Sequence, residues 1–297
     1  MADRGAWSHP IGGDTLTAGV FGDPVAHSLS PVMHNAGYAA LGLNRVYLPF
    51  RVAAAQLTPA LHAVSALGLL GVNVTIPHKE RAARFLRDRL SEEARLLGVV
   101  NCIINRDGKL SGDNTDARGL QLDLQSHRAP IKDRAVVVIG AGGGAAAALL
   151  AAQREGARRI ILFNRTRARA RRLARRFPAL PITLKDLSAL SQPSLFTNAG
   201  LIVNATPVGL GGEPFPDLPY AATPDDCLFY DLIYRRDTTS FLRPALTLGR
   251  RTTDGLGMLL YQGMVAFELF NGVPAPAAAM RQALFDAVGR SVTAADG

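Results

Sequence analysis

A glycine-rich turn in the middle of the chain has the residue types and spacing that bind a phosphate. Residues 135–139 are a short apolar run rich in valine, which breaks into Gly-Ala-Gly-Gly-Gly-Ala at residues 140–145 before an alanine-rich segment. Gly140 permits a sharp turn, Gly142 lacks the Cβ that would block a pyrophosphate, and Ala145 is small enough for a helix to pack on the strand. The free N–H groups of the helix start then face phosphate oxygens. The stretch predicts a dinucleotide site.

The next apolar run indicates which dinucleotide this is. Residues 159–163 are a second predicted strand, and Asn164, Arg165 and Thr166 follow it in place of an acidic residue. An acidic side chain there would hold the ribose 2′-hydroxyl of NAD and repel a 2′-phosphate, whereas Arg165 and Arg169 attract one. We therefore expect NADP.

Two ionisable residues elsewhere are candidates for proton transfer. Lys79 follows a predicted strand that Pro77 ends, and it precedes a helix rich in arginine. A single lysine is usually solvated surface, but at the end of a strand it is positioned to meet a ligand. Asp116 stands at a predicted helix start, where it has two candidate roles, to complement the helix dipole and to contact a ligand.

Several polar residues have both a structural and a ligand-binding interpretation. Ser28 and Ser30 precede Pro31 at a helix start, where a hydroxyl either caps the helix or holds an anion. Asn101, inside a predicted strand over residues 99–104, is either a satisfied core amide or a ligand contact. Met258 and Gln262, on a helix expected from Thr253–Gly257 to about residue 270, are by default core and surface.

The elements that must position these residues alternate along the chain. Strands are expected at residues 17–21, 45–50, 69–75, 99–104, 135–139, 159–163, 201–204 and 228–232, with helices between them, including residues 54–67 and 277–288. Ser91 is expected to cap a helix that ends at Leu97. Alternating strands and helices predict an α/β fold.

Composition limits the class of protein. The chain has 297 residues, 48% hydrophobic and 19% charged, which suits one large or two ordinary domains. The two cysteines, Cys102 and Cys227, lie in apolar runs and indicate a reducing compartment, and no secretory signal is seen, so we expect a cytoplasmic protein whose residues 1–16 are a flexible extension. No charge interrupts residues 135–153, but four glycines favour a strand, turn and helix over a membrane span.

The charge balance raises the question of nucleic acid. The net charge is +9, and seven arginines lie between Arg165 and Arg176. No zinc pattern or RNP-like strand accompanies them, so a solvated basic face beside a phosphate site is favoured over a nucleic-acid surface.

Nine short motifs, taken together, resemble those of the shikimate dehydrogenase family. In chain order they are GDPVAHSLSP, NVTIPHKE, VVNC, GDNTD, GAGGGA, NRT, NATPVG, YDLIY and DGLGMLLYQ. Each is weak alone, but their order and spacing match the family from Thr17 to about Arg290.

The resemblance implies two α/β domains and an NADP-dependent enzyme. Residues 17–116 and 255–297 would form a substrate-binding domain, to which the C-terminal helices return, and residues 117–254 a Rossmann-like NADP-binding domain. The reaction would be the reversible reduction of 3-dehydroshikimate to shikimate, a step in chorismate and aromatic amino acid biosynthesis. The enzyme would be a monomer or a homodimer.

Site residues follow from the resemblance by position. Lys79 would transfer the proton, paired with Asp116. Substrate would bind to Ser28, Ser30, Thr75, Asn101, Asp116, Tyr234 and Gln262, with the two serines and the tyrosine at the carboxylate. NADP would bind to Gly140, Ala141, Gly142, Gly143, Gly144, Ala145, Asn164, Arg165, Thr166, Arg169, Leu232, Gly255 and Met258, the last three at the nicotinamide end.

Other activities stay open at this point. Cys102 stands where the family usually has threonine, which removes a hydroxyl beside Asn101. A dehydrogenase for quinate or an aminated analogue is one alternative, and a non-catalytic sensor of pathway metabolites with a nucleic-acid surface is another. Arg165 and Arg169 argue against NAD, and Lys79 with Asp116 argues against a sensor.

Overall fold

The structure, a computed structural model, describes residues 11–292 and divides into two compact units. The first unit runs to Thr115 and resumes over Gln262–Val292, and the second spans Asp116–Tyr261. Of the predicted N-terminal extension, residues 1–10 lie outside the described residues, and Leu16 already belongs to a strand. Asp116 and residues 255–261 group with the second unit.

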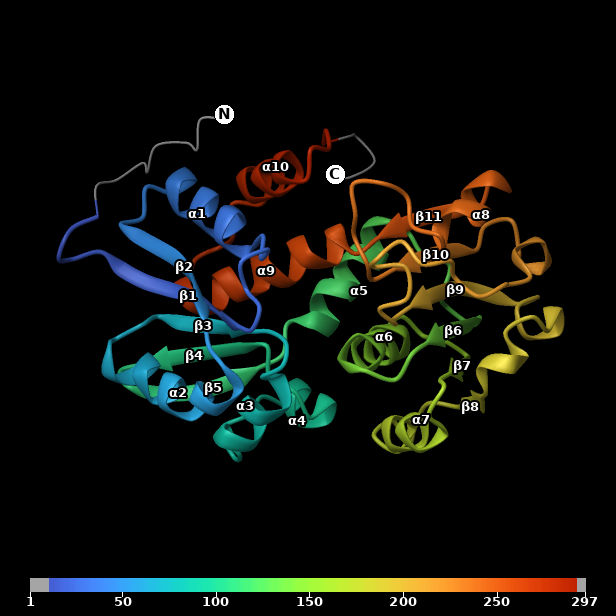
Figure 1. Ribbon diagram of the computed structural model, residues 1–297, viewed down its shortest axis with the longest axis horizontal. Coiled ribbons are helices and arrows are strands. Elements are labelled where there is room, and N and C mark those ends of the chain that lie inside the picture. The colour runs from blue at the N-terminus through green and yellow to red at the C-terminus, as the bar shows by residue number, and fades with distance from the viewer. Residues whose placement is uncertain (1–10, 293–297) are drawn as a thin grey trace. The chain divides into compact units, whose positions relative to one another are not determined.

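The first unit is built on a mixed sheet. Its elements are β1 (Leu16–Gly22), α1 (Ser30–Ala40), β2 (Arg45–Arg51), a 3-10 turn (Ala54–Gln56), α2 (Leu57–Ala66), β3 (Gly71–Val74), α3 (Lys79–Leu86), α4 (Glu92–Leu97), β4 (Cys102–Arg106), β5 (Lys109–Asp113), most of α9 (Leu256–Asn271) and α10 (Ala277–Ala287). The strand order is β2-β1-β3-β4-β5 (Figure 1). The first three strands are parallel, whereas β4 is antiparallel to both of its neighbours.

Helices cover this sheet with apolar side chains. Leu57, Leu61 and Val64 of α2 are buried in one cluster with strand residues such as Val72 and Ile103. The C-terminal helices return to this unit, as expected. A Cβ on Gly37 of α1 would lie 2.8 Å from Phe267 of α9 and 3.2 Å from Met280 of α10, so glycine allows these helices to approach closely.

The second unit is a six-stranded parallel sheet. Its elements are α5 (Asp116–Ser126), β6 (Ala135–Ile139), α6 (Gly143–Arg154), β7 (Arg159–Phe163), α7 (Arg167–Ala174), β8 (Ile182–Lys185), 3-10 turns at Leu187–Ala189, Pro193–Leu195 and Tyr220–Ala222, β9 (Ala199–Asn204), β10 (Leu228–Asp231), α8 (Leu242–Thr247), β11 (Arg251–Asp254) and the start of α9. The strand order is β11-β10-β9-β6-β7-β8 (Figure 1). This is the Rossmann order, with its switch point between β6 and β9.

Predicted and observed bounds agree best for two strands of the second sheet, β6 and β7. β6 and β7 have the predicted bounds because each is an apolar run that is buried almost throughout. In the first unit, Ser91 caps α4 by accepting a hydrogen bond from the Ala94 N–H at 3.1 Å, as predicted.

Three predicted boundaries are wrong. The strand expected over residues 99–104 begins at Cys102, because the N–H of Val100 bonds to the Lys79 carbonyl instead of a strand. The helix expected from residue 54 is a 3-10 turn followed by α2. Residues 251–254 are the strand β11, so the helix expected to open at Thr253 starts at Leu256.

The alanine-rich α6 is a buried helix of the domain. Residues 145–152 are all buried. Within residues 11–292, no helix is both long enough and apolar enough to span a bilayer.

Candidate functional site

A cavity of about 370 Å³ lies at the carboxyl ends of β6, β7 and β9. Its lining comes from the loops after these three strands, from Arg169 of α7 and from Leu187 of the 3-10 turn after β8. The lining residues are Gly140, Ala141, Gly142, Asn164, Arg165, Thr166, Arg169, Leu187, Ala205, Thr206, Pro207 and Val208. In parallel sheets of this order, ligands bind at the switch point outside the carboxyl ends of the strands.

The four glycines of the turn differ in whether the protein leaves room for a Cβ at their positions. Gly140 has φ +119°, and its Cβ would lie 2.6 Å from the Ala205 carbonyl oxygen. A Cβ on Gly144 would lie 2.5 Å from Leu232. By contrast, a Cβ on Gly142 or Gly143 would meet no atom within 4 Å. Protein packing therefore requires glycine at two positions, whereas the other two leave open space at the start of α6.

The basic side of the cavity comes from the end of β7 and the first turn of α7. Arg165, Thr166 and Arg169 are exposed, and the Asn164 side-chain amide donates to the Thr166 carbonyl at 2.8 Å. Within residues 11–292, neither arginine that lines the cavity forms an ion pair, and no acidic residue lines it. The lining therefore suits an anion.

A buried carboxylate that our sequence analysis missed lies behind Thr206, one of the lining residues, and is linked to it through Asn204. Asp231, at the end of β10, accepts hydrogen bonds from Thr239 Oγ1 at 2.6 Å, Asn204 Nδ2 at 2.9 Å and the Ile233 N–H at 3.1 Å. Asn204 Oδ1 in turn accepts from the Thr206 hydroxyl at 2.7 Å, and Thr206 lines the cavity. Burial raises the pKa of Asp231 to about 6, against the lowering effect of these bonds. A lone aspartate at the end of an apolar strand was the available signal.

The residues predicted for the nicotinamide end lie together beside the turn. Leu232 contacts the position of Gly144, and a Cβ on Gly255 would lie 2.3 Å from the Leu232 carbonyl oxygen. Met258 follows in the first turn of α9 and is half-buried. These residues thus form a small-residue and apolar wall.

In the first unit, Thr115 links the two predicted amides, Asn101 and Gln262. Asn101 Oδ1 accepts from the Thr115 N–H at 2.8 Å, and Asn101 Nδ2 donates to Thr115 Oγ1 at 3.0 Å. The Thr115 hydroxyl also lies 3.4 Å from Gln262 Oε1. Asn101 is therefore a satisfied core amide, one of the two roles predicted for it, and its contact with a ligand stays a prediction. Gln262 is half-buried instead of exposed.

Thr75 and Lys79 lie at the same edge of this sheet. Thr75 follows β3 and donates its N–H to the Phe21 carbonyl at 2.9 Å, and a Cβ on Gly22 would lie 2.5 Å from the Thr75 methyl. Lys79 is the first residue of α3 and is half-buried. Its carbonyl accepts the Val100 N–H at 3.0 Å, so the main chain places Lys79 next to the segment that carries Asn101.

The helix-cap interpretation of the two serines is wrong. The residue before α1 is Leu29, and no side chain caps the helix. Ser28 Oγ accepts the Ser30 N–H at 3.4 Å, and the Ser30 hydroxyl bonds to Tyr47, whose pKa burial raises well above its ordinary value. Both hydroxyls thus lie at the edge where β1 ends, without a role in capping.

The remaining predicted residues belong to the second unit. Asp116 is buried in the first turn of α5. Tyr234 follows β10 and is half-buried, and burial raises the pKa of its hydroxyl, with the charge of Asp254 acting in the same direction.

The arginine-rich helix has the face predicted for it. Ala170 and Leu173 are buried against the domain, whereas Arg167, Arg171 and Arg172 are exposed. Both cysteines are buried, and neither forms a disulfide with another described residue.

Three segments of the chain match models of known protein families. Residues 20–103 match the shikimate dehydrogenase substrate binding domain, residues 123–208 the family shikimate / quinate 5-dehydrogenase, and residues 255–285 the shikimate 5′-dehydrogenase C-terminal domain.

Individual relatives agree along nearly their full length. Shikimate dehydrogenase (NADP(+)) of Desulforamulus reducens is 40% identical over 290 residues, which cover 94% of this chain and 98% of the relative. The structure of shikimate 5-dehydrogenase from Listeria monocytogenes, in complex with shikimate and NAD, is 33% identical, with a TM-score of 0.87 over 93% of this chain and 99% of that one. Shikimate 5-dehydrogenase from Thermus thermophilus, in complex with NADP(H) and shikimate, is 37% identical, with a TM-score of 0.80 over 92% and 99%.

These matches agree with the parallel sheet, the cavity at its switch point, the glycine turn and the polar cluster around Asn101. The chain belongs to the shikimate dehydrogenase family of oxidoreductases.

Proposed function

We propose that this chain catalyses the NADP-dependent, reversible reduction of 3-dehydroshikimate to shikimate. The observation that carries the proposal is the cavity at the switch point, which is lined by a glycine turn and two exposed arginines. Among the described residues, no acidic side chain lines this cavity. Membership of the family supplies the substrate class.

NADP fits the cavity by its chemistry. The open space at Gly142 and Gly143 admits a pyrophosphate to the N–H groups at the start of α6. Arg165 and Arg169, with Asn164 and Thr166, hold the 2′-phosphate. Leu232, Gly255 and Met258 pack against the nicotinamide, which supplies the hydride when it is bound.

In this proposal most of the substrate-binding residues belong to the first unit, and the second unit binds the dinucleotide and contributes Asp116 and Tyr234. Short hydroxyls suit a carboxylate, so Ser28 and Ser30 hold that group together with Tyr234. Thr75, Asn101, Asp116 and Gln262 bond to the ring hydroxyls. Since Asn101 is already held by Thr115, its amide meets the substrate in a set orientation, which lowers the entropic cost of binding.

Lys79 transfers the proton. Reduction of the ketone builds negative charge on its oxygen, and the Lys79 ammonium stabilises that charge and then gives the oxygen a proton. In the reverse direction, the neutral amine accepts the proton of the shikimate hydroxyl. Asp116, paired with Lys79 in this proposal, orients the same hydroxyl. The buried thiols of Cys102 and Cys227 support a reducing compartment such as the cytoplasm.

The test is a turnover assay with four pairings, shikimate or quinate with NADP or NAD. We expect fast turnover with shikimate and NADP alone. Turnover with quinate or NAD would assign the chain to another specificity of the family. Binding of shikimate without turnover in any pairing would instead favour the sensor.

A further inference from the structure

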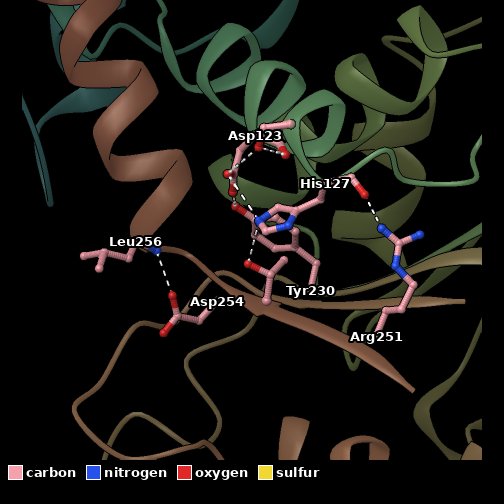
Figure 2. A network of polar contacts seen from close by, with 8 residues as sticks. Asp123, His127, Tyr230, Arg251, Asp254 and Leu256 are labelled. Carbon is pink, nitrogen blue, oxygen red and sulfur yellow. Dashed lines mark hydrogen bonds and ion pairs between the residues drawn. The ribbon is translucent and has the colours of Figure 1, made fainter. Parts of the chain in front are cut away.

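A buried polar cluster in the second unit lies outside the predicted site. Asp123 of α5 is 2% exposed and Tyr230 of β10 is fully buried, and the tyrosine hydroxyl donates to Asp123 Oδ2 (Figure 2). His127 Nε2 lies 3.6 Å from Asp123 Oδ1 and 3.0 Å from Thr253 Oγ1. Burying a carboxylate costs free energy, so we ask what this cluster of bonded side chains does for the protein.

The cluster contacts the first turn of α9. A Cβ on Gly257 would lie 2.1 Å from Asp123 Oδ1, so only glycine fits beside this carboxylate. Tyr230 also accepts the backbone N–H of Met258, and Asp254 Oδ1 accepts that of Leu256 at 3.1 Å. Since the first N–H groups of a helix have no partner within the helix, these contacts determine where α9 starts.

That turn carries the residues proposed for the nicotinamide end. Gly255 precedes α9 and touches Leu232, and Met258 is the residue whose N–H bonds to Tyr230. Neither Asp123 nor Tyr230 lines the cavity proposed for the adenosine half of the cofactor. The cluster therefore acts on one end of the dinucleotide site.

The charges in the cluster are consistent with a fixed hydrogen bond. Burial raises the pKa of Asp123, and Asp254 acts in the same direction, whereas the bond from Tyr230 and the charge of His127 oppose it. Burial also raises the pKa of Tyr230 well above its ordinary value, with Asp123 and Asp254 adding to the rise. The Tyr230 hydroxyl thus stays protonated at neutral pH and donates a hydrogen bond to Asp123.

Resting on the function proposed above, we propose that Asp123 is a positioning residue for the nicotinamide end of the site. Acting through Tyr230, it holds the first turn of α9 so that Gly255 and Met258 meet the reacting ring in one orientation. Misplacing a reacting group by about 1 Å can cost on the order of 100-fold in rate.

The experiment compares two ligands on the whole protein. NADPH occupies both ends of the dinucleotide site, whereas adenosine 2′,5′-bisphosphate reaches only the end near Arg165. In Asp123→Ala and Tyr230→Phe, we expect the Kd of NADPH to rise roughly tenfold and kcat with shikimate and NADP to fall by about 10- to 100-fold. The Kd of adenosine 2′,5′-bisphosphate, measured by calorimetry, should change less than about twofold, because neither Asp123 nor Tyr230 lines its cavity.

Two further variants separate positioning from a general loss of packing. Asp123→Asn keeps an oxygen that accepts from Tyr230, so it should recover most of both losses. Ser126→Ala removes a hydroxyl that lies 3.5 Å from Asp123 Oδ1 and, among the described residues, donates no hydrogen bond to α9, so it should behave as the wild type. If Asp123→Ala does not fold, Tyr230→Phe and Asp123→Asn carry the test.

The outcomes are distinct. Wild-type kcat and an unchanged ratio of the two Kd values in Tyr230→Phe and Asp123→Ala would overturn the positioning role, as would equal weakening of both ligands. Failure of the wild type to turn over shikimate with NADP would instead overturn the proposed function.

Discussion

In the first unit the candidate amides Asn101 and Gln262 are buried and half-buried, and Thr115 bonds to both, whereas in the second the candidate arginines are exposed and form no ion pair within residues 11–292. The difference matches the ligands proposed for them. A small polyol is distinguished by the direction of hydrogen bonds, which requires side chains that are already oriented. A phosphate is attracted by charge, which acts over a longer distance and tolerates mobile side chains. Replacing a residue of the first kind should lower both stability and binding, and replacing one of the second kind should lower binding alone.

The largest effect is expected at Lys79, which is an exception to this difference between the units because it lies in the first unit but its proposed role is chemical. We expect Lys79→Ala to lower kcat for shikimate about 10²- to 10⁴-fold, with a small change in KM and in melting temperature, because general acid catalysis is lost. Steady-state kinetics and thermal unfolding measure this. Lys109→Ala, which removes an exposed lysine of β5, is the matched control and should be neutral. Equal turnover by the two variants would contradict the assignment.

Asp231 tests whether the second unit also contains residues that set stability. Its pKa is raised from 3.8 to about 6 because the folded state disfavours the buried charge. The folded state therefore binds this proton more tightly than the unfolded state, so the stabilisation is complete below about pH 4 and is lost as the pH rises through about 6. Asp231→Asn has no such titration, so its stability relative to the wild type should rise by roughly 3 kcal/mol between about pH 4 and 7. Urea unfolding across this range measures it, and parallel profiles would show that Asp231 does not titrate there.

Asn101 tests whether a buried amide of the first unit contributes to both stability and substrate binding. Asn101→Ala leaves the Thr115 N–H without its acceptor, so we expect a loss of roughly 2 kcal/mol in the free energy of unfolding and a higher KM for shikimate. Asn105→Ala is the matched control, because this amide also bonds to backbone groups of the same unit, including the Leu69 carbonyl at 2.8 Å. It should lower stability without changing KM. A normal KM in Asn101→Ala would remove Asn101 from the substrate site.

Arg165 provides the converse test in the second unit. We expect Arg165→Ala to raise KM for NADP about tenfold, a loss of roughly 1.4 kcal/mol, while KM for NAD and the melting temperature stay nearly unchanged. Arg171→Ala, an exposed arginine of α7 that does not line the cavity, should leave both values of KM unchanged. A parallel loss for both cofactors would contradict the 2′-phosphate role.

The smallest effect on cofactor binding is expected at Gly142. A Cβ there meets no protein atom, so Gly142→Ala should change the free energy of unfolding by no more than about 1 kcal/mol while weakening the binding of NADP several-fold. Gly140→Ala should instead destabilise the fold by roughly 1–3 kcal/mol, because φ is +119° and the Ala205 carbonyl lies in the way. Calorimetry and urea unfolding distinguish the two. Unchanged NADP binding in Gly142→Ala would mean that the open space is not the pyrophosphate site.

The elements that could be predicted are those whose local pattern matches their environment. β6 and β7 are buried apolar runs bounded by glycine or polar residues, so their bounds follow from the pattern. The β4–β5 hairpin was missed, although Asp107 and Gly108, with φ of 51° and 82°, are the Asp-Gly pair typical of a two-residue hairpin turn. β11 was missed because its four polar residues have no apolar pattern, and they form a strand only by pairing with β10.

Sequence alone determined the dinucleotide turn, the basic residues after β7 and the family, because these depend on residues that lie close together in the chain or on motifs in a fixed order. Only the tertiary structure decided which glycines the protein itself requires, how Asp231 and Asn204 shape the cavity wall, and why Asp123 lies beside Gly257. The physical reason is that these facts concern distances between residues far apart in the chain, and burial and hydrogen bonding across such distances appear only when the strands are paired and the helices packed.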